Sequence, residues 1–342
     1  MASPITGINS YIEQHRLTLK LKSVSVGELH LARKLRHPVY VFKNGIFFPV
    51  ITQGSSPTKE QIHTLIKHNH REVFIFNDDL QDIKKSLEQA LLKVTRSLSV
   101  GDPLTNGTKD IKLLTLNLGG LYQNPHSDEL LMLQFQSTQN LSKFLCENKK
   151  LQPQLYQNLL SENFHYTLSH PMLSSILLLS FLQATRLFHE KEVENLFLAS
   201  YLKDIGFSMI PADKYDLKTL TTRDQELFAD HADFSFELLE GRIPLAKNYL
   251  HIIKHHHFMN DKMKGLLSKD PRDQMKEPDM IFGLESTLVA VFDILVAMTA
   301  DRPYREGKSW FQSLDLIKKM MADDYPQEFK ALVIFLKNFY KF

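Results

Sequence analysis

Residues 289–305 read VAVFDILVAMTADRPYR, and they give the strongest indication of the fold class of the second half of the chain. From residue 286 to residue 300 the sequence is almost uninterruptedly apolar, which predicts a buried helix with Asp293 near its middle. A buried carboxylate without a partner costs several kcal/mol, so Asp293 needs a cation or several hydrogen-bond donors beside it. The stretch therefore predicts a polar site inside a helical domain.

The sequence before this stretch is also helical in pattern. From about residue 151 onward, one apolar or amphipathic segment follows another. Phe197, Tyr201 and Asp204 recur at helical spacing, which directs a second carboxylate inward at the end of a buried helix. Residues 151–342 are therefore expected to form an all-α bundle.

Residues 1–100 are expected to form a small α+β module. Alternating apolar and polar residues indicate half-buried strands, and Asn44-Gly45 is a strong signal for a hairpin turn. The expected elements are a strand at 17–26, a hairpin at 37–51, a helix at 57–68, a strand at 72–79 and a helix at 82–100. Residues 101–107 (GDPLTNG) break the helical pattern, and bridging helices are expected over 101–150. The fold class is thus a small α+β N-terminal domain followed by a helical bundle.

Composition narrows the classes of function. The formal net charge of +2 over 342 residues argues against an extended nucleic-acid or membrane surface, but a local basic pocket is compatible with it. Cys146 is the only cysteine, which excludes a thiolate zinc cluster and favours a reducing, cytoplasmic setting. The N-terminal residues lack the pattern of a signal peptide, and apolar runs such as 177–182 are too short to span a bilayer.

A set of histidines and aspartates recurs near the ends of the expected helices. Imidazoles and carboxylates that arrive from separate helices suit Mn, Fe or Zn ions, and helical bundles commonly build such sites. Each residue alone is weak evidence, because a lone histidine on an apolar helix is usually a core residue with a satisfied hydrogen bond. The alternative for the whole set is a degenerate polar core. The candidate metal ligands are His170, Asp204, His231, His256, His257 and Asp293.

The order and spacing of these residues resemble the HD-GYP family over residues 165–310. Residues 289–305 are similar to the family's run around its last metal-binding Asp, followed by Asp-Arg-Pro-Tyr-Arg. IIKHHHF (252–258) resembles its paired-histidine helix, ADHADFSFELLEG (229–241) its single-histidine helix and YTLSHP (166–171) its opening helix. The family consists of metal-dependent phosphodiesterases that hydrolyse cyclic di-GMP, a bacterial second messenger, so the resemblance implies an HD-type bundle with that activity.

The resemblance implies a role for each candidate residue. One metal would be held by His170, Asp204 and Asp293, and Asp204 would bridge to a second metal completed by His231, His256 and His257. Arg302 and Arg305 would contact substrate phosphate, a role that suits the planar guanidinium group. The alternative for both arginines is helix-end capping and surface ion pairs.

The sequence departs from the family pattern at several of these positions. Lys203 stands where the family has the His of its His-Asp pair, and Tyr166 stands where many members have a metal-binding Glu. Phe207 replaces a phosphate-contacting Lys, and Phe258 replaces a Glu. The Gly-Tyr-Pro motif is absent, and a charged loop is expected over 260–280 instead.

These departures change the expected chemistry. The second metal position keeps four protein ligands, whereas the Lys203 ammonium would repel an ion at the first position and neutralise Asp204 or Asp293 there. One bound ion is therefore favoured over two. Two-metal hydrolysis uses both ions to stabilise the charge that develops on phosphorus, so turnover is expected to be impaired or absent. Lys203 and Asp204 remain the candidate catalytic residues, because a buried lysine that loses its proton can act as a base.

Three functions stay open. The first is a divergent phosphodiesterase for cyclic di-GMP or a related nucleotide. The second is a non-catalytic sensor of that nucleotide or of a metal, which signals through a protein partner. The third is an interaction scaffold that uses the N-terminal module, whose role is expected to be regulatory, and the loop at 260–280. The helices over 82–150 are candidates for pairing two copies, and no nucleic-acid or membrane partner is expected.

Overall fold

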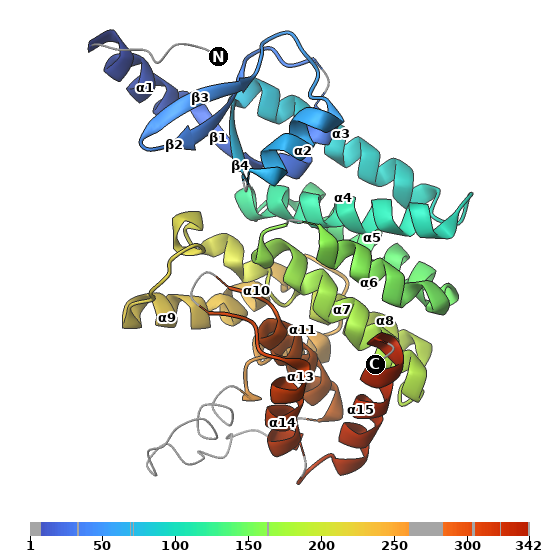
Figure 1. Cartoon of the computed structure of the whole chain (residues 1–342). Coiled ribbons are helices and arrows are strands. Elements are labelled where there is room, and N and C mark those ends of the chain that lie inside the picture. Colours follow the sequence, from blue (N-terminus) through green and yellow to red (C-terminus); the bar gives the residue numbers. More distant parts are fainter. Residues whose placement is uncertain are drawn as a thin grey trace. The chain divides into compact units, whose positions relative to one another are not determined.

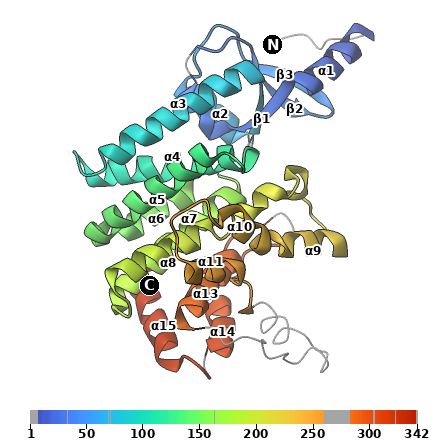
Figure 2. The same ribbon diagram turned by 180° about the vertical axis from the view of Figure 1, so that it is seen from behind.

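The computed structural model describes residues 8–32, 34–68, 70, 72–162, 164–259, 283–302, 305–321 and 323–340. The expected loop at 260–280 lies outside the described residues. The chain divides into two compact units, which comprise residues 1–93 with 163–165, and residues 94–162 with 166–342. Figure 1 and Figure 2 show the elements of each unit from opposite sides.

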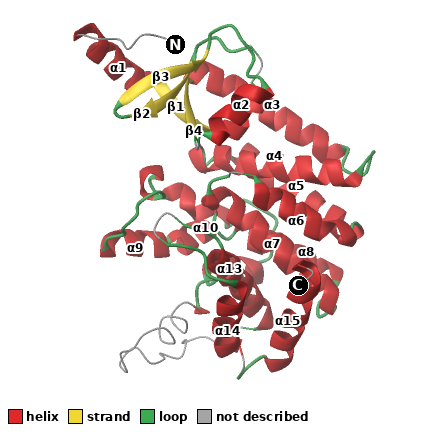
Figure 3. Ribbon diagram, in the orientation of Figure 1, coloured by secondary structure: helices red, strands yellow, loops and turns green. Residues whose placement is uncertain are grey.

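The N-terminal unit is built on a four-stranded antiparallel sheet, drawn in yellow in Figure 3. The strands are β1 (Leu21–Ser25), β2 (Val39–Lys43), β3 (Ile46–Ile51) and β4 (Glu72–Phe76), in the spatial order β1-β4-β2-β3. The helical elements are α1 (Ile8–Lys20), the 3₁₀ helix η1 (Val26–Leu31), α2 (Lys59–Lys67) and α3 (Asn77–Arg96). The division between the two units falls within α3.

The expected hairpin is confirmed. Asn44 and Gly45 join β2 to β3 and adopt positive φ angles of 52° and 78°, as tight hairpin turns require. The expected strand at 17–26 is wrong in its first part, because residues 17–20 are the last residues of α1. Leu19 is 71% exposed, so the alternation of apolar and polar residues around it does not correspond to a strand with one buried face.

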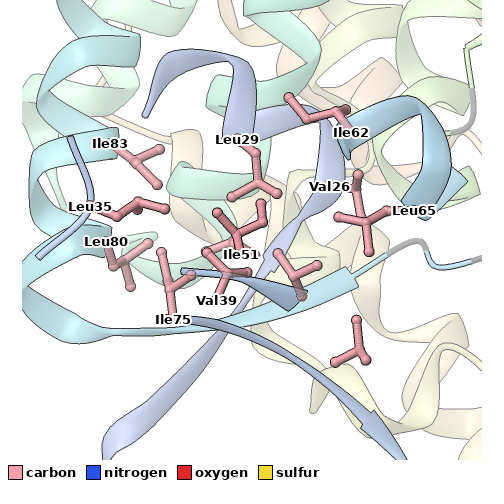
Figure 4. Packing of buried hydrophobic residues seen from close by; sticks show 13 residues of the cluster. Val26, Leu29, Leu35, Val39, Ile51, Ile62, Leu65, Ile75, Leu80 and Ile83 are labelled. Carbon is pink, nitrogen blue, oxygen red and sulfur yellow. The ribbon is translucent and has the colours of Figure 1, made fainter. Parts of the chain in front are cut away.

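One face of the sheet is covered by helices. Ile62 and Leu65 of α2 pack with Val39 and Ile51 of the sheet, and Figure 4 shows these side chains in one buried cluster. Ile83 extends the cluster along the first turns of α3. The N-terminal unit therefore has a hydrophobic core of its own, as the α+β prediction requires.

The second unit is helical, which confirms the expected fold class. Its helices are α4 (Pro103–Gln123), α5 (Asp128–Glu147), α6 (Gln152–Ser161), α7 (Tyr166–Thr185), α8 (Glu190–Leu202), α9 (Thr222–Ala229), α10 (His231–Leu239), α11 (Lys247–Lys254), α13 (Leu284–Thr299), α14 (Trp310–Met321) and α15 (Pro326–Tyr340). The expected break at 101–107 is shorter than predicted, because Asp102 caps α4 and Pro103 starts it.

Helices α7, α8 and α13 pack against one another and form the apolar centre of this unit. Among the described helices, α7 alone is long and apolar enough to cross a bilayer, and 78% of its most apolar window is buried inside the structure. Such burial is expected for the core helix of a bundle. Polar side chains project from α7 and α13 and from the turn after α8, and others come from α10 and from the segment after α11.

Candidate metal centre

Five segments of the helical unit converge on one polar site. His170 comes from α7, Asp204 from the turn after α8, and His231 from the first position of α10. His256 and His257 follow α11, and Asp293 lies within α13. The ligand atoms form two groups, in each of which they lie within 4.8 Å of one another: His231 with His256 and His257, and His170 with Asp204 and Asp293. The structure therefore brings all six predicted ligands together.

The turn after α8 is held tightly against α10. A Cβ on Gly206 would lie 2.0 Å from the carbonyl oxygen of His231, so only glycine allows the two backbones to approach this closely. The Gly206 amide donates to Oγ of Ser235 at 2.8 Å, and Ser235 Oγ lies 2.6 Å from the carbonyl oxygen of Lys203. These contacts fix Lys203 and Asp204 relative to His231.

The Nε2 atoms of the three histidines lie close together, and backbone contacts orient two of the rings. Nδ1 of His231 lies 2.5 Å from the Phe228 carbonyl oxygen, and Nδ1 of His256 lies 2.6 Å from the Ile253 carbonyl oxygen. Each Nδ1 must carry the proton that makes this bond, so Nε2 of each neutral ring carries a lone pair. Nε2 of His231 lies 3.3 Å from Nε2 of His256 and 3.1 Å from Nε2 of His257.

Asp204 adds a carboxylate to this cluster. Its Oδ1 lies 3.2 Å from Nε2 of His231 and 3.5 Å from Nε2 of His256. If Nε2 of His231 carried a proton, it could donate to only one of these neighbouring acceptor atoms. A metal ion, by contrast, accepts electron pairs from all three imidazoles and from the carboxylate. Burial and the neighbouring imidazoles hold the pKa of His257 well below its ordinary value, which keeps this ring neutral and able to bind a metal. The donor set therefore fits a divalent transition-metal ion.

The other group of ligands surrounds the ammonium of Lys203. Its Nζ lies 2.5 Å from Oδ2 of Asp204 and 3.0 Å from Oδ1 of Asp293, and the side chain is fully buried. Ser174 Oγ is a third neighbour of this ammonium, at 3.4 Å. Burial disfavours the charge of Lys203, but Asp204 and Asp293 outweigh burial and raise the pKa of Lys203 above its ordinary value.

His170 completes this group as a neutral ring. Its Nε2 lies 2.7 Å from Oδ1 of Asp293 and 4.0 Å from Oδ2 of Asp204. Burial, together with the charge of Lys203, lowers the pKa of His170, so the neutral ring donates its Nε2 proton to Asp293. Burial opposes ionisation of both carboxylates, but the Lys203 charge holds the pKa of each well below its ordinary value. One ammonium thus sits between two ionised carboxylates.

The two predicted phosphate-binding arginines have different surroundings. The Arg302 guanidinium stacks over the ring of Tyr166, 4.0 Å from its centroid, and its charge contributes to the lowered pKa of His170. Nη2 of Arg305 donates to the carbonyl oxygen of Ala297 at 2.6 Å. This contact in the last turn of α13 is the helix-end capping that was the alternative for Arg305.

Several residues of the site carry no ligand signal in the sequence. Ser174 and Ser235 contact Lys203, and the Tyr122 hydroxyl lies 3.2 Å from the Asp204 carbonyl oxygen. Phe207 stacks on the His231 ring with 4.3 Å between centroids and 20° between planes. The i+4 spacing of Ser235 from His231 on α10 is a signal that could have indicated its position.

Comparisons with known proteins indicate the family and the fold of this chain. A profile of the HD domain family matches residues 154–328. The solved structure of Bd1817, a HDG"Y"P protein from Bdellovibrio bacteriovorus, is similar over 93% of this chain and 99% of that chain, with a TM-score of 0.60 and 19% sequence identity. No curated protein matches the sequence significantly. HD domains bind divalent metals and act as metal-dependent phosphohydrolases. The chain belongs to the HD domain family and has the fold of an HD-GYP-like protein.

Proposed function

We propose that this chain is a divergent HD-GYP-type phosphodiesterase domain in cyclic di-GMP signalling, with one metal ion and with impaired or absent turnover. The observation that carries the proposal is the position of Lys203. Its ammonium pairs with Asp204 and Asp293 at 2.5 and 3.0 Å, while the three histidines and Asp204 retain four donors for one ion. An ammonium cannot share a ligand pocket with a dication without strong repulsion.

The residues take the following roles in this proposal. His231, His256, His257 and Asp204 hold the ion, which when bound polarises a phosphoryl oxygen. Lys203 takes the place of the first ion and keeps Asp204 and Asp293 ionised, and His170 orients Asp293 through its hydrogen bond. Losing the charge compensation of one ion is expected to lower the rate by a few powers of ten. This corresponds to an activation barrier that is about 3–5 kcal/mol higher.

The link to cyclic di-GMP rests on two supports. Residues 289–305 resemble the corresponding run of the HD-GYP family, and the structural neighbour is described as a HDG"Y"P protein. Arg302 is the better placed of the two arginines for a phosphate, because stacking on Tyr166 holds its guanidinium near His170. Arg305 is assigned the same role in the proposal, although its contact with Ala297 competes with it.

A second candidate is a non-catalytic sensor of the nucleotide or of a metal, acting through a protein partner. The stacking of Phe207 on His231 favours this candidate, because an apolar ring occupies the position at which the resemblance implies a phosphate-contacting Lys. Both candidate functions share three further proposals. These are a regulatory role for the N-terminal module, pairing of two copies through the helices over 82–150, and a cytoplasmic location.

Metal content and turnover separate these functions. The purified full chain is expected to contain one divalent ion per chain by elemental analysis, and hydrolysis of cyclic di-GMP is measured with added Mn²⁺ or Fe²⁺. The decisive variant is Lys203→His, which replaces the ammonium with a neutral imidazole. Metal content should rise from one ion to two, and turnover should rise by at least about 100-fold. A Lys203→His chain that gains neither metal nor activity would refute the role given to Lys203.

Binding of the nucleotide separates enzyme from sensor. Measurable binding of cyclic di-GMP without product, in the presence of Mn²⁺ or Fe²⁺, would favour the sensor. If the chain neither binds nor hydrolyses the nucleotide, the link to cyclic di-GMP is wrong.

A further inference from the structure

The hairpin of β2 and β3 exposes apolar side chains on both faces of the sheet. Four of its side chains are between 37% and 50% exposed: Phe42, Ile46, Phe48 and Val50. Val41 belongs to the buried cluster, so its neighbour Phe42 points to the opposite face. Phe48 lies opposite Val41 in the register and shares the face of Val41. Exposed apolar surface gathered in one place marks a site that contacts a protein or a membrane.

The outer edge of β3 is closed to another strand. The turn of the hairpin lies at the end of the sheet away from α2 and α3, and α1 contacts β3 (Figure 1). The Phe47 amide donates to Oε1 of Gln14 in α1 at 2.8 Å, and Nε2 of Gln14 donates to the Phe47 carbonyl oxygen at 3.4 Å. Pro49 has no amide hydrogen to offer. A partner of the hairpin therefore contacts its side chains and does not pair with the backbone of β3.

The charges around the hairpin are almost all positive. From residue 14 to residue 59 the sequence has eight lysines and arginines but one acidic residue, Glu28, which is buried. Exposed basic residues lie on β2 and on α1: Lys43, Arg16 and Lys20. The adjacent strand β4 contributes one carboxylate, Glu72, which accepts a hydrogen bond from Ser23 at 2.6 Å. The net charge of +2, from which no membrane partner was expected, hides this basic region because the rest of the chain is acidic.

We infer that the β2–β3 hairpin and α1 dock this chain on the surface of an anionic lipid bilayer. The apolar side chains of the hairpin enter the boundary between headgroups and acyl chains, and the basic side chains contact the headgroups. A rigid protein or a single-stranded nucleic acid covers one face of a sheet, whereas fluid lipid surrounds both faces of an inserted hairpin. The inference goes beyond the proposed function, which assigns no membrane contact, and it does not depend on the metal centre.

Sedimentation with lipid vesicles tests the docking. The full chain is mixed with vesicles of phosphatidylcholine alone, or of equal parts of phosphatidylcholine and phosphatidylglycerol, and the bound fraction is measured. We expect binding to the vesicles that contain phosphatidylglycerol, and little binding to phosphatidylcholine alone. Affinity should fall by about 10-fold or more when NaCl is raised from about 0.1 M to about 0.5 M, because salt screens the attraction of the basic residues to the headgroups.

Substitutions separate the apolar part of the docking surface from the basic part. The double variant Phe42→Ser, Phe48→Ser should lower the affinity for these vesicles by about 10-fold or more. Phe311→Ser is its matched control, because Phe311 of α14 is 83% exposed and should leave the affinity within about twofold. Far-ultraviolet circular dichroism shows whether each variant is folded.

The basic part is tested at the end of β2, where no packed side chain is removed. Lys43→Glu should lower the affinity by about fivefold or more, since it replaces an attracted charge with a repelled one. Lys109→Glu makes the same change at an exposed position of α4 and should leave the affinity within about twofold. Equal losses in these two variants would contradict a local docking surface.

A fluorescent label reports whether the hairpin enters the bilayer. Ile46→Cys is made in a Cys146→Ser chain, so that a nitrobenzoxadiazole group can be attached at residue 46 alone. On vesicles with phosphatidylglycerol, its emission should rise and should be quenched by lipids that carry spin labels on their acyl chains. The same label at Lys109→Cys should stay unquenched.

The outcomes leave the proposed function to its own tests. Equal binding to both kinds of vesicle, binding to neither, or an unquenched label at residue 46 would overturn the inference. Binding to a fluorescent oligouridylate but not to vesicles would also overturn it and would assign the hairpin to RNA. Because metal content and cyclic di-GMP turnover are measured without vesicles, either proposal can fail while the other stands.

Discussion

Lys203 and Asp293 form a buried ion pair, with 3.0 Å between Nζ and Oδ1, although they lie on different helical segments far apart in sequence. The same ammonium contacts Asp204, so one cation compensates the two carboxylates that are predicted metal ligands. Removing one partner from a buried ion pair leaves an uncompensated charge, which is more costly than losing a surface ion pair.

This pair predicts the effect of Lys203→Met on stability. Without the ammonium, Asp204 and Asp293 repel each other in a buried setting, and the free energy of unfolding of metal-free protein should fall by about 3–5 kcal/mol. Urea unfolding measures the change, and Mn²⁺ should restore more stability to the variant than to the unmodified chain. Lys254→Met is the control, because the partly exposed pair of Lys254 and Asp233 should contribute less than about 1 kcal/mol. Equal effects of the two substitutions would contradict the role of Lys203.

Gly206 predicts a second effect on stability and on metal binding. In Gly206→Ala, the new Cβ would collide with the backbone of His231 and Ser235, at 2.0 and 2.6 Å, and neither atom can rotate away. We expect a loss of at least about 2 kcal/mol and a weaker affinity for Co²⁺, since His231 must shift relative to Asp204. Gly120→Ala in α4 meets no atom within 4 Å and should stabilise the chain by about 0.5–1 kcal/mol. Unchanged stability of Gly206→Ala would show that the turn after α8 can move.

Asp110 predicts a pH dependence of stability. This residue of α4 is fully buried, its Oδ1 accepts from Oγ1 of Thr95 at 3.2 Å, and burial raises its pKa to about 7. Between pH 3.8 and about 7 the unfolded chain ionises Asp110 while the folded chain keeps the proton, so stability falls as pH rises through this window.

Asp110→Asn isolates this contribution, because asparagine imitates the protonated acid. Relative to the unmodified chain, the variant should gain about 4 kcal/mol in free energy of unfolding between pH 4 and pH 7, and no more above pH 7. Urea unfolding at a series of pH values measures the difference. A difference that stays constant with pH would mean that Asp110 is ionised in the folded chain.

The arginines predict separable effects on binding and on stability. Arg302→Ala should lower the affinity for cyclic di-GMP by about 10-fold or more and leave stability within about 1 kcal/mol, because its cation–π contact with Tyr166 is modest. Arg305→Ala should lower stability by about 1.5–3 kcal/mol, since it removes a charged hydrogen bond to the Ala297 carbonyl group. Isothermal titration and urea unfolding measure the two effects. The reverse pattern would assign the phosphate contact to Arg305 alone.

Residue type, spacing and the family resemblance predicted much of the fold and the candidate residues of the site. The hairpin was predicted from Asn44-Gly45, because few residue pairs adopt two positive φ angles. The helical bundle was predicted from long segments in which apolar residues recur at helical spacing. Burial in apolar segments, where a partner is required, indicated Asp204 and Asp293, and the family resemblance supported the whole set of six metal-ligand candidates. The strand expected at 17–26 was wrong in its first part, because alternation along an exposed helix end resembles alternation along a strand.

Which atoms of those residues come into contact depends on the packing of the helices and could not be predicted from the sequence. The sequence predicted that Lys203 neutralises Asp204 or Asp293, and the structure has its ammonium between both. The family resemblance predicted His256 and His257 as ligands rather than His255, and the backbone path after α11 directs those two to the site and His255 to His251. The physical reason is that a sequence pattern reports which side chains are buried, whereas their mutual distances depend on how separate helix ends pack. That packing was set here by backbone contacts such as Gly206 against α10.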